Sequence, residues 1–416
     1  MCSRNWEVKV VIVGGGTAGW WTAGCLEHNF PDWDITLIES KDIPIVGVGE
    51  STVPQIGNFL SNIGIEDSHW LANSNALKKY GNRKINWRKS GDDNFDWTFW
   101  YNYNKKFEGW AQKFRKGEVD LDSLNDFYDP NDWSGYAYHV DAFEMGRMVK
   151  DHCKNVKHVY ATLTEKPEAD LVFDCSGFAA RFVEDKTKQH YPHTIIDRAF
   201  VGPHEPRDDL PMVTQSIGRD YGWQFIVKLK NRVGVGYVYS SRHVSDEDAY
   251  KEFEEMIDEG GFVPMGLPSE ANSYNDKHMF FKWEPHALTN PWSGNVVAIG
   301  TTAGFIDPLE ANALFHIQHG IETFVKCWKR GYGKKTYNKA VRISWNNTVD
   351  LMKHHYALSD RDDTEFWRYW DCCREECRQS VWDNYEKRHN LETNLYPSSI
   401  WATMAAYFDE WKRAPF

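Results

Sequence analysis

The chain has 416 residues, of which 41% are hydrophobic and 26% charged, and its formal charge is −12 at pH 7. This length and composition predict a soluble, enzyme-sized protein of two or three structural units. The acidic balance argues against nucleic acid or an anionic membrane as a partner, since both require a basic surface. No run of 18 apolar residues occurs, and residues 1–10 show no leader pattern, so we expect a cytoplasmic protein without a membrane span.

The eight cysteines show no regular spacing, which is typical of reduced thiols in a reducing compartment. Three of them, Cys372, Cys373 and Cys377, are close together in the sequence, which is one pattern of a metal site. No second pair of ligands at zinc spacing accompanies them. We therefore favour packing on one helix face.

The most informative stretch lies near the start, where an apolar, β-branched run over residues 8–13 meets a glycine-rich turn and then a helical pattern. Gly14 permits the tight turn, Gly16 lets the backbone approach a pyrophosphate, and Gly19 lets the helix pack closely on the strand. The N-terminus of the helix supplies free N–H groups to the phosphates. A second strand, residues 35–39, ends at Glu39, where a carboxylate can bind ribose hydroxyls. This arrangement predicts a bound dinucleotide; the alternative is a glycine-rich turn in an ordinary α/β protein.

The remaining pattern predicts an α/β fold with a Rossmann-like module at residues 1–330 and a helical region at residues 331–416. Further parallel strands are expected at 169–174 and 295–300, a short strand at 158–163 and helices at 141–153 and 311–328. Period-two alternation between residues 222 and 241 predicts a hairpin within an antiparallel sheet spanning about 205–285. Residues 77–87 are basic and aromatic without clean periodicity, so a solvated face is the default for their charges, and residues 91–133 are expected to be irregular.

Six blocks resemble the flavin-dependent halogenases of the tryptophan halogenase family, and together they cover nearly the whole chain. They are GGGTAGW at 14–20, GVGESTVP at 47–54, YHVDA at 138–142, DCSGF at 174–178, GVGYVYSSR at 234–242 and AIGTTAGFIDPLE at 298–310. The resemblance implies an FAD-binding fold and a substrate-side helical C-terminal region. It also implies FAD in its reduced form, a halide ion, a separate flavin reductase and a small electron-rich aromatic substrate of the indole or phenol type. A homo-oligomer remains open.

In this family a lysine stands eight residues before the tryptophan of an Asn-Trp pair, which here is Trp87, and the corresponding residue is Lys79. The resemblance implies that Lys79 delivers hypohalous acid, formed from O2 and halide at a flavin C4a-hydroperoxide, to one ring carbon. Glu310 matches the glutamate that accompanies this lysine. The alternatives are a solvated Lys79 and a Glu310 that caps the following helix.

The resemblance also assigns binding residues. The cofactor positions are Gly14, Gly16, Thr17, Ala18, Gly19, Glu39, Ser40, Gly49, Glu50, Ser51, Thr301, Asp307 and Leu314. The halide positions are Asn312 and Ala313, and the substrate-side positions are Trp223 and Phe225.

Two departures from the family pattern bear on specificity. Ala311, Asn312 and Ala313 replace the usual Ser-Thr-Gly, from which we expect a changed halide preference, toward bromide or iodide. The segment Trp223-Gln224-Phe225-Ile226-Val227 keeps the first aromatic and the isoleucine of the family's Trp-x-Trp-x-Ile-Pro, but the second aromatic is Phe225 and the proline is lost. This loss favours a less usual substrate. A flavin-dependent aromatic hydroxylase is the second hypothesis, and a catalytically silent flavin-binding protein is the third.

Overall fold

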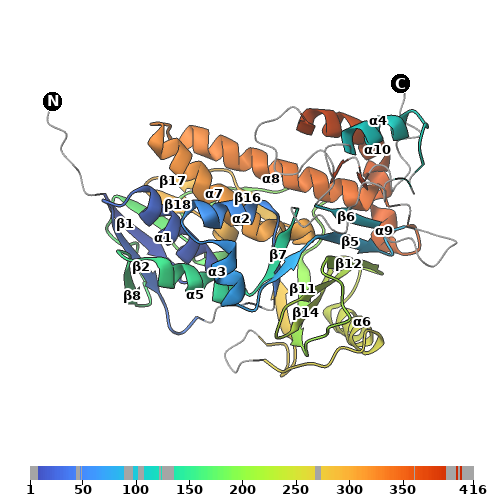
Figure 1. The fold of residues 1–416 in the computed structure, drawn as a ribbon, viewed down its shortest axis with the longest axis horizontal. Helices are drawn as coiled ribbons and strands as arrows, with labels where there is room; N and C mark the ends of the chain where they lie inside the picture. The colour runs from blue at the N-terminus through green and yellow to red at the C-terminus, as the bar shows by residue number, and fades with distance from the viewer. Residues whose placement is uncertain are drawn as a thin grey trace.

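The computed structural model describes residues 8–43, 47, 49–88, 97–101, 107–120, 123, 135–267, 273–359, 361–389, 400, 401, 403 and 404. Two large sheets organise these residues, and a long helix runs along both (Figure 1).

The first sheet has strand order β17-β18-β9-β1-β2-β8. Its strands are β1 (Lys9–Val13), β2 (Asp34–Glu39), β8 (Lys157–Tyr160), β9 (Leu171–Asp174), β17 (Trp292–Ser293) and β18 (Val296–Ala298). All neighbouring pairs are parallel except β17 with β18. Helices α1 (Thr17–Asn29) and α5 (Ala142–His152) pack against each other beside it. Since both faces are covered, the central strands are continuous apolar runs. The expected parallel strands thus all lie in one sheet.

The second sheet has strand order β15-β11-β14-β13-β12-β5-β6. Its strands are β5 (Gly81–Ile85), β6 (Trp97–Trp100), β11 (Arg198–His204), β12 (Thr214–Arg219), β13 (Gly222–Lys228), β14 (Val233–Tyr239) and β15 (Met279–Lys282). The expected hairpin is β13 with β14, but the predicted extent of 205–285 is wrong, because β11 begins at Arg198 and β5 and β6 join from the N-terminal part. Helix α6 (Asp246–Glu259) packs on β14.

Smaller elements connect the sheets. They are β3 (Glu50–Ser51), α2 (Gln55–Asn62), α3 (Asp67–Ala72), β4 (Leu77–Lys79), α4 (Phe107–Arg115), β7 (Ala137–Val140), β10 (Lys188–Gln189), β16 (His286–Leu288) and β19 (Gly304–Phe305), with 3-10 turns at Gly177–Ala179, Gly300–Thr302 and Leu309–Ala311. The expectation of irregular structure over 91–133 is wrong where β6 and α4 lie. Strand β7 pairs with both β3 and β4, which brings Ser51 and Lys79 to one small sheet.

The C-terminal part is helical: α7 (Asn312–Lys329), α8 (Lys334–Ala357), α9 (Glu365–Tyr369) and α10 (Asp371–His389). Helix α8 runs along the length of the molecule from the first sheet to the second (Figure 1). Trp367, Trp370 and Trp401 are buried in one hydrophobic cluster with residues of the second sheet. Within the described residues, no helix combines the length and apolar character needed to cross a lipid bilayer.

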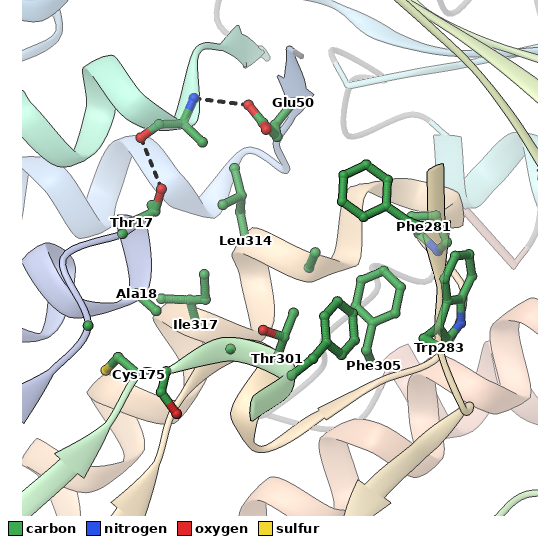
Figure 2. Close-up of a pocket in the computed structure, with 18 of the residues that line it drawn as sticks. Thr17, Ala18, Glu50, Cys175, Phe281, Trp283, Thr301, Phe305, Leu314 and Ile317 are labelled. Carbon is green, nitrogen blue, oxygen red and sulfur yellow. Dashed lines mark hydrogen bonds between the residues drawn. The ribbon is translucent and has the colours of Figure 1, made fainter. Parts of the chain in front are cut away.

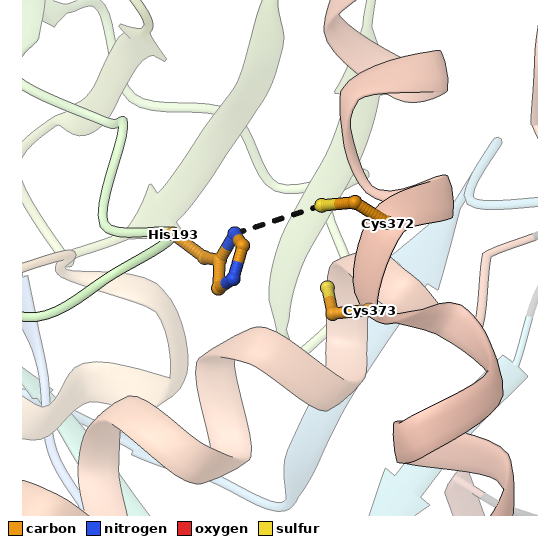
Figure 3. Close-up of side chains that lie close together, drawn as sticks. All are labelled: His193, Cys372 and Cys373. Carbon is orange, nitrogen blue, oxygen red and sulfur yellow. Dashed lines mark hydrogen bonds between the residues drawn. The ribbon is translucent and has the colours of Figure 1, made fainter.

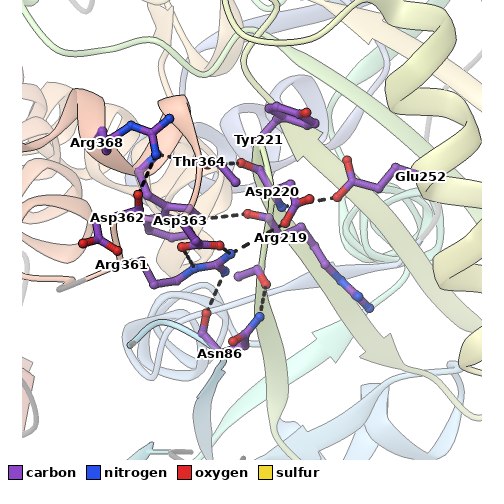
Figure 4. A network of polar contacts seen from close by, with 12 residues as sticks. Asn86, Arg219, Asp220, Tyr221, Glu252, Arg361, Asp362, Asp363, Thr364 and Arg368 are labelled. Atoms are coloured by element: carbon purple, nitrogen blue, oxygen red, sulfur yellow. Dashed lines mark hydrogen bonds and ion pairs between the residues drawn. The ribbon is translucent and has the colours of Figure 1, made fainter. Parts of the chain in front are cut away.

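A buried arginine joins the C-terminal helices to the second sheet (Figure 4). The Arg361 guanidinium donates to the carbonyl of Asn86, just after β5, at 3.1 Å, and pairs with Asp363 through Nε at 3.0 Å. It also approaches Asp220, in the β12–β13 turn, to 3.7 Å. Thr364 donates to the carbonyl of Asp220 at 2.7 Å. These contacts fix α9 over the ends of β5 and β12.

Candidate active site

A single cavity of about 660 Å³ begins at the glycine loop after β1 and extends to the second sheet. Its first part is lined by the loop and the start of helix α1, with Glu50 of β3 above them and Leu314 and Ile317 of α7 beside them (Figure 2). Its other part is lined by aromatic side chains of the second sheet and β19: Trp223, Phe225, Phe281, Trp283 and Phe305. The size and the mixed lining are typical of a site for a large organic cofactor or substrate.

The glycine loop has the geometry that a pyrophosphate requires. Gly14 has φ +114°, and a Cβ there would lie 2.3 Å from the carbonyl oxygen of Cys175 on the neighbouring strand end. A Cβ on Gly19 would lie 1.8 Å from the Gly14 carbonyl, so this glycine permits close packing of helix on loop rather than lining the cavity. A Cβ on Gly16 would meet nothing within 4 Å, which leaves room for a ligand against the backbone. Helix α1 begins at Thr17 without a side-chain cap, so its first N–H groups remain available.

Glu39 ends β2 beside this loop, as the fingerprint predicts. Its carboxylate occupies the space that a side chain on Gly15 would need, since a Cβ there would lie 1.3 Å from Oε2. Oε1 lies 2.7 Å from Nε2 of His158, which orients the carboxylate at the cavity edge. Ser40 also lines the cavity and exchanges a 2.7 Å hydrogen bond with Thr162. The loop and Glu39 together fit the adenosine diphosphate half of a dinucleotide.

Strand β3 carries Glu50 and Ser51 to the opposite wall of the cavity. Oε2 of Glu50 accepts from the backbone N–H of Ala142 at 2.9 Å, at the start of α5. Burial, together with the negative charge of Asp141, raises the pKa of Glu50 to about 8. Glu50 is therefore mostly protonated at neutral pH and presents no net charge. Gly49, with φ +124°, makes the turn that brings this strand in.

Lys79 lies at the end of β4 and is fully buried. Its Nζ donates to the hydroxyl of Ser51 at 2.5 Å and to the carbonyl of Thr52 at 3.1 Å. Burial lowers the pKa of Lys79 to about 7, against the attraction of Glu310 and with a further contribution from the positive charge of Lys84. The expectation of a solvated face for residues 77–87 is wrong for Lys79 and Lys84, because both are buried against polar partners.

Glu310 lines the cavity from the loop before α7. Its backbone has φ +63°, and its carboxylate forms an ion pair with Nζ of Lys84 at 2.5 Å. It also accepts from Nδ2 of Asn82 at 2.6 Å and lies 3.4 Å from Nε2 of His355 on α8. The helix-capping alternative is wrong, since α7 has no side-chain cap and the carboxylate contacts the second sheet instead. The ion pair with Lys84 outweighs burial and keeps the pKa of Glu310 below its usual range.

Several predicted residues occupy positions other than those expected. Lys79, Asp307 and Asn312 are not among the residues that line the cavity. Oδ2 of Asp307 accepts from the Tyr356 hydroxyl at 2.6 Å and Oδ1 from the Leu309 N–H at 3.0 Å. Nδ2 of Asn312 donates to the carbonyls of Asp307 and Leu309. Both side chains hold the loop that carries Glu310, because each satisfies backbone groups there.

The other predicted positions of this region do reach the cavity. Ala18, Thr301, Ala313 and Leu314 line it near the glycine loop, and Trp223 and Phe225 line it on the second sheet. Figure 2 shows Phe281, Trp283 and Phe305 grouped across the space from Thr17 and Glu50. The cavity therefore has a polar, glycine-rich part for phosphates and an aromatic part for flat rings.

Comparison with known proteins decides the family. The sequence profile described as tryptophan halogenase matches residues 9–155 and 140–409. The chain belongs to the tryptophan halogenase family. It is 28% identical to the tryptophan 7-halogenase RebH of Lentzea aerocolonigenes, with 86% of this chain and 78% of that protein covered. It is 27% identical to the tryptophan 6-halogenase SttH of Streptomyces toxytricini, covering 88% and 81%.

Solved structures show the same fold. The tryptophan halogenase of Shewanella frigidimarina superposes with a TM-score of 0.80 at 23% identity, covering 97% of this chain and 89% of that one. The flavin-dependent halogenase Xcc4156 of Xanthomonas campestris gives a TM-score of 0.78 at 24% identity, covering 97% and 89%. This halogenase is thus a flavin-dependent enzyme of a class that halogenates aromatic substrates, which disfavours the hydroxylase and the silent flavoprotein. The residues of the glycine loop fit FAD, the cofactor that membership of the family implies.

Sequence reasoning missed part of the halogenase site. Lys84, Asn82 and His355 all contact Glu310, yet none was singled out. The available signal was alternation: Asn82 and Lys84 are two residues apart on β5 and face the same side. Because these inward positions are polar, the pattern did not resemble a strand. His355 had no such signal, since only the fold brings α8 to the cavity.

Cys372, Cys373 and Cys377 are not among the residues that line the cavity. Figure 3 shows Cys372 and Cys373 on one helix, with His193 beside them. His193 joins Cys372 and Cys373, and their three potential ligand atoms lie within 4.8 Å of one another. The thiols of Cys372 and Cys373 donate to the carbonyls of Tyr369 at 3.1 Å and Trp370 at 3.4 Å. Cys373 and Cys377 are buried in the hydrophobic cluster with Trp370. Packing in this cluster accounts for the buried thiols of Cys373 and Cys377, and Cys373 also has its backbone hydrogen bond.

Proposed function

We propose that this enzyme uses FADH2, O2 and a halide to make hypohalous acid, which Lys79 delivers to a small electron-rich aromatic ring of the indole or phenol type. The observation that carries the proposal is the placement of Lys79: fully buried, with a pKa lowered to about 7, and hydrogen-bonded to Ser51, which lines the same cavity as Glu310. A lysine with this pKa has both its amine and its ammonium form at neutral pH. Reduced FAD, when bound, would supply the oxidation of the halide.

The cofactor residues follow from the two parts of the cavity. We propose that Gly14, Gly16, Thr17 and Ala18 bind the pyrophosphate and that Glu39 and Ser40 face the ribose. Gly49, Glu50, Ser51, Thr301 and Leu314 are proposed to face the flavin. Gly19, Asp307 and Asn312 then act on the shape of the site, the first through helix packing and the others through the loop before α7.

We also propose separate roles for the two regions of the chain. Residues 1–330 form the FAD-binding module, and residues 331–416 form the substrate-side region. Two contacts from α8 support this: Tyr356 donates to Asp307, and His355 lies 3.4 Å from Glu310. The helical region thereby supports the residues next to which the substrate ring is expected.

Glu310 is proposed as the catalytic carboxylate. The ion pair with Lys84 keeps it negatively charged, so it can stabilise a cationic ring intermediate or accept the proton that leaves the ring. Lys79 has a separate set of partners, Ser51 and Thr52, and its amine remains available for the electrophilic halogen. In the same site, Glu310 therefore stays negatively charged, whereas Lys79 keeps an amine for the electrophilic halogen.

We propose that the halide binds at the start of α7 and that bromide or iodide is preferred over chloride. Ala313 and Leu314 line the cavity in the first turn of this helix, whose N–H groups favour an anion. Ala311 places a methyl group where the family has a serine hydroxyl, and Ala313 places one where the family has a glycine. An apolar lining compensates poorly for the lost hydration of a small anion, so the larger and more weakly hydrated halides are favoured.

The substrate is proposed to lie against the aromatic part of the cavity, with Trp223 and Phe225 on its wall. The relatives named above act on tryptophan, whereas the altered segment around Phe225 favours a different small aromatic. A separate flavin reductase is proposed to supply FADH2.

One experiment tests the whole proposal. The enzyme is supplied with FAD, NADH, a flavin reductase, a panel of indoles and phenols, and chloride, bromide and iodide in competition, and products are analysed by mass spectrometry. We expect brominated or iodinated product that disappears in Lys79→Ala and in the absence of reductase. Preferential chlorination would overturn the halide proposal, and unchanged yield in Lys79→Ala would overturn the role of Lys79. Turnover with NADH alone would overturn the need for a reductase.

A further inference from the structure

A chain of hydrogen bonds runs from Lys79 into the protein and ends at a backbone carbonyl. Nζ of Lys79 lies 2.5 Å from Oγ of Ser51, which lies 2.7 Å from Oγ1 of Thr214 on β12. That oxygen lies 2.8 Å from Nε2 of His139 on β7, and Nδ1 of His139 lies 3.0 Å from the carbonyl oxygen of Lys228 on β13. Lys79 and His139 are fully buried, and Thr214 is 8% exposed. These hydrogen bonds therefore link five strands, β4, β3, β12, β7 and β13, and the side chains of Lys79 and His139 are shielded from water.

The terminal carbonyl fixes the direction of every bond in this chain. A carbonyl oxygen only accepts, so the proton of a neutral His139 lies on Nδ1 and donates to Lys228. Nε2 then carries a lone pair and accepts from the Thr214 hydroxyl. A hydroxyl has one hydrogen, so Thr214 must accept from Ser51. With its only hydrogen given to Thr214, Ser51 must accept from Lys79.

The same reasoning determines the orientation of the Lys79 nitrogen. One N–H is directed to Ser51 and a second to the carbonyl of Thr52 at 3.1 Å. Among the described residues these are the hydrogen bonds of Nζ, which leaves one tetrahedral position on this nitrogen. In the ammonium form this position is an N–H, and in the amine form it is the lone pair. The nitrogen can thus change from donor to acceptor in that one direction without any movement of the side chain.

We infer that His139, Thr214 and Ser51 are positioning residues, which aim the remaining position of the Lys79 nitrogen at the electrophilic halogen. The inference rests on the proposed role of Lys79 in delivery. Preorganised hydrogen bonds in a buried site hold a reacting group in place at no further cost during the reaction. Without these hydrogen bonds, the Lys79 amine would be free to rotate and could direct an N–H at the halogen instead of its lone pair.

The charges around Lys79 are compatible with this arrangement. Glu310 and Lys84 are the charged side chains that act on its titration, and its Nζ lies 5.4 Å from the centre of the Tyr101 ring. Burial and the positive charge of Lys79 lower the pKa of His139 to about 3, so the imidazole stays neutral at the pH values at which Lys79 titrates. The hydrogen bonds therefore keep the same donors and acceptors whether Lys79 is protonated or neutral.

The test compares Thr214→Val with Thr214→Ser. Valine has the shape of threonine but no hydroxyl and breaks the chain, whereas serine keeps the hydroxyl. Thr194→Val is the control, because it deletes a hydroxyl bonded to the carbonyl of Tyr191 at 2.8 Å, outside the cavity. For each variant, FAD affinity, consumption of reduced FAD, halogenated product and released hypohalous acid are measured with the reductase supplied. Expressing product per reduced FAD consumed removes any effect on cofactor binding.

We expect Thr214→Val to consume reduced FAD at the normal rate, to give about 10-fold less product per flavin and to release more hypohalous acid. Thr214→Ser and Thr194→Val should match the parent enzyme. Equal losses in Thr214→Val and Thr214→Ser, or a normal product yield in Thr214→Val, would overturn the inference. If Thr214→Val fails to fold, His139→Leu against His139→Gln makes the same comparison, since Gln retains an acceptor near Nε2. Full product yield in Lys79→Ala would instead refute the delivery role itself.

Discussion

Replacing Lys84 with methionine tests whether the buried ion pair supports both the fold and Glu310. Lys84 and Glu310 have side chains only 1% and 3% exposed, and their charged atoms are 2.5 Å apart. Removing one partner of such a pair leaves an uncompensated buried charge and typically costs about 3–5 kcal/mol. Since unfolding a chain of 416 residues has an entropy of about 0.9 kcal/mol/K, the melting temperature should fall by about 3–6 °C.

The double variant Lys84→Met/Glu310→Gln provides the control, because it removes both charges at once. Scanning calorimetry at pH 7 should show that most of the lost stability returns in the double variant. In Lys84→Met alone, burial raises the pKa of Glu310, so its carboxylate protonates as the pH falls and the loss of stability shrinks. For the same reason, the acidic limb of the halogenation pH profile should move to higher pH. A melting temperature unchanged in Lys84→Met, or losses that simply add in the double variant, would refute the reasoning.

Three further predictions follow from the same geometry. Lys79→Met should abolish halogenation yet stabilise the fold: burial lowers the Lys79 pKa from 10.5 to about 7, so protonated Lys79 costs up to about 5 kcal/mol below pH 7. Between pH 7 and 10.5 the unfolded state binds the extra proton, so the parent enzyme gains stability as the pH rises and the advantage of Lys79→Met in denaturant titrations should fade. Gly14→Ala should lower the melting temperature, because its Cβ would lie 2.3 Å from the Cys175 carbonyl oxygen. Gly16→Ala has open space around its Cβ and should keep the melting temperature but weaken FAD binding in fluorescence titrations.

The glycine loop was predictable because its determinants are local. Gly14, Gly16 and Glu39 belong to one strand-turn-helix-strand unit, and the backbone geometry at Gly14 itself requires a glycine. Hydrophobic periodicity likewise located β13 and β14. Asn82 and Lys84 place polar groups on the inner face of β5, which is the reverse of the usual pattern, so β5 and its place in the sheet could not be predicted.

The catalytic region depends on long-range contacts that no local pattern encodes. Asn82 and Glu310 meet although 228 residues separate them, and His139 meets Thr214 across 75 residues. Lys79 was found only through the family resemblance and its spacing from Trp87. Its burial was missed because isolated lysines are almost always exposed. A charge pattern that is solvated in most proteins is here enclosed by Ser51, Thr52 and the strand pairings around them.

The two buried lysines explain how the site can keep one carboxylate charged and one amine close to neutrality. Had Glu310 paired directly with Lys79, the attraction would have held that lysine as an ammonium ion, with no lone pair for an electrophile. The structure instead places Lys84 against Glu310 at 2.5 Å, while within the described residues Lys79 donates to the uncharged oxygens of Ser51 and Thr52. Lys84 thus maintains the charge of Glu310 and, through its own positive charge, lowers the pKa of Lys79 further. In the proposed mechanism, a second lysine is therefore what allows an anion that favours a cationic ring and an amine that accepts halogen to work in the same site.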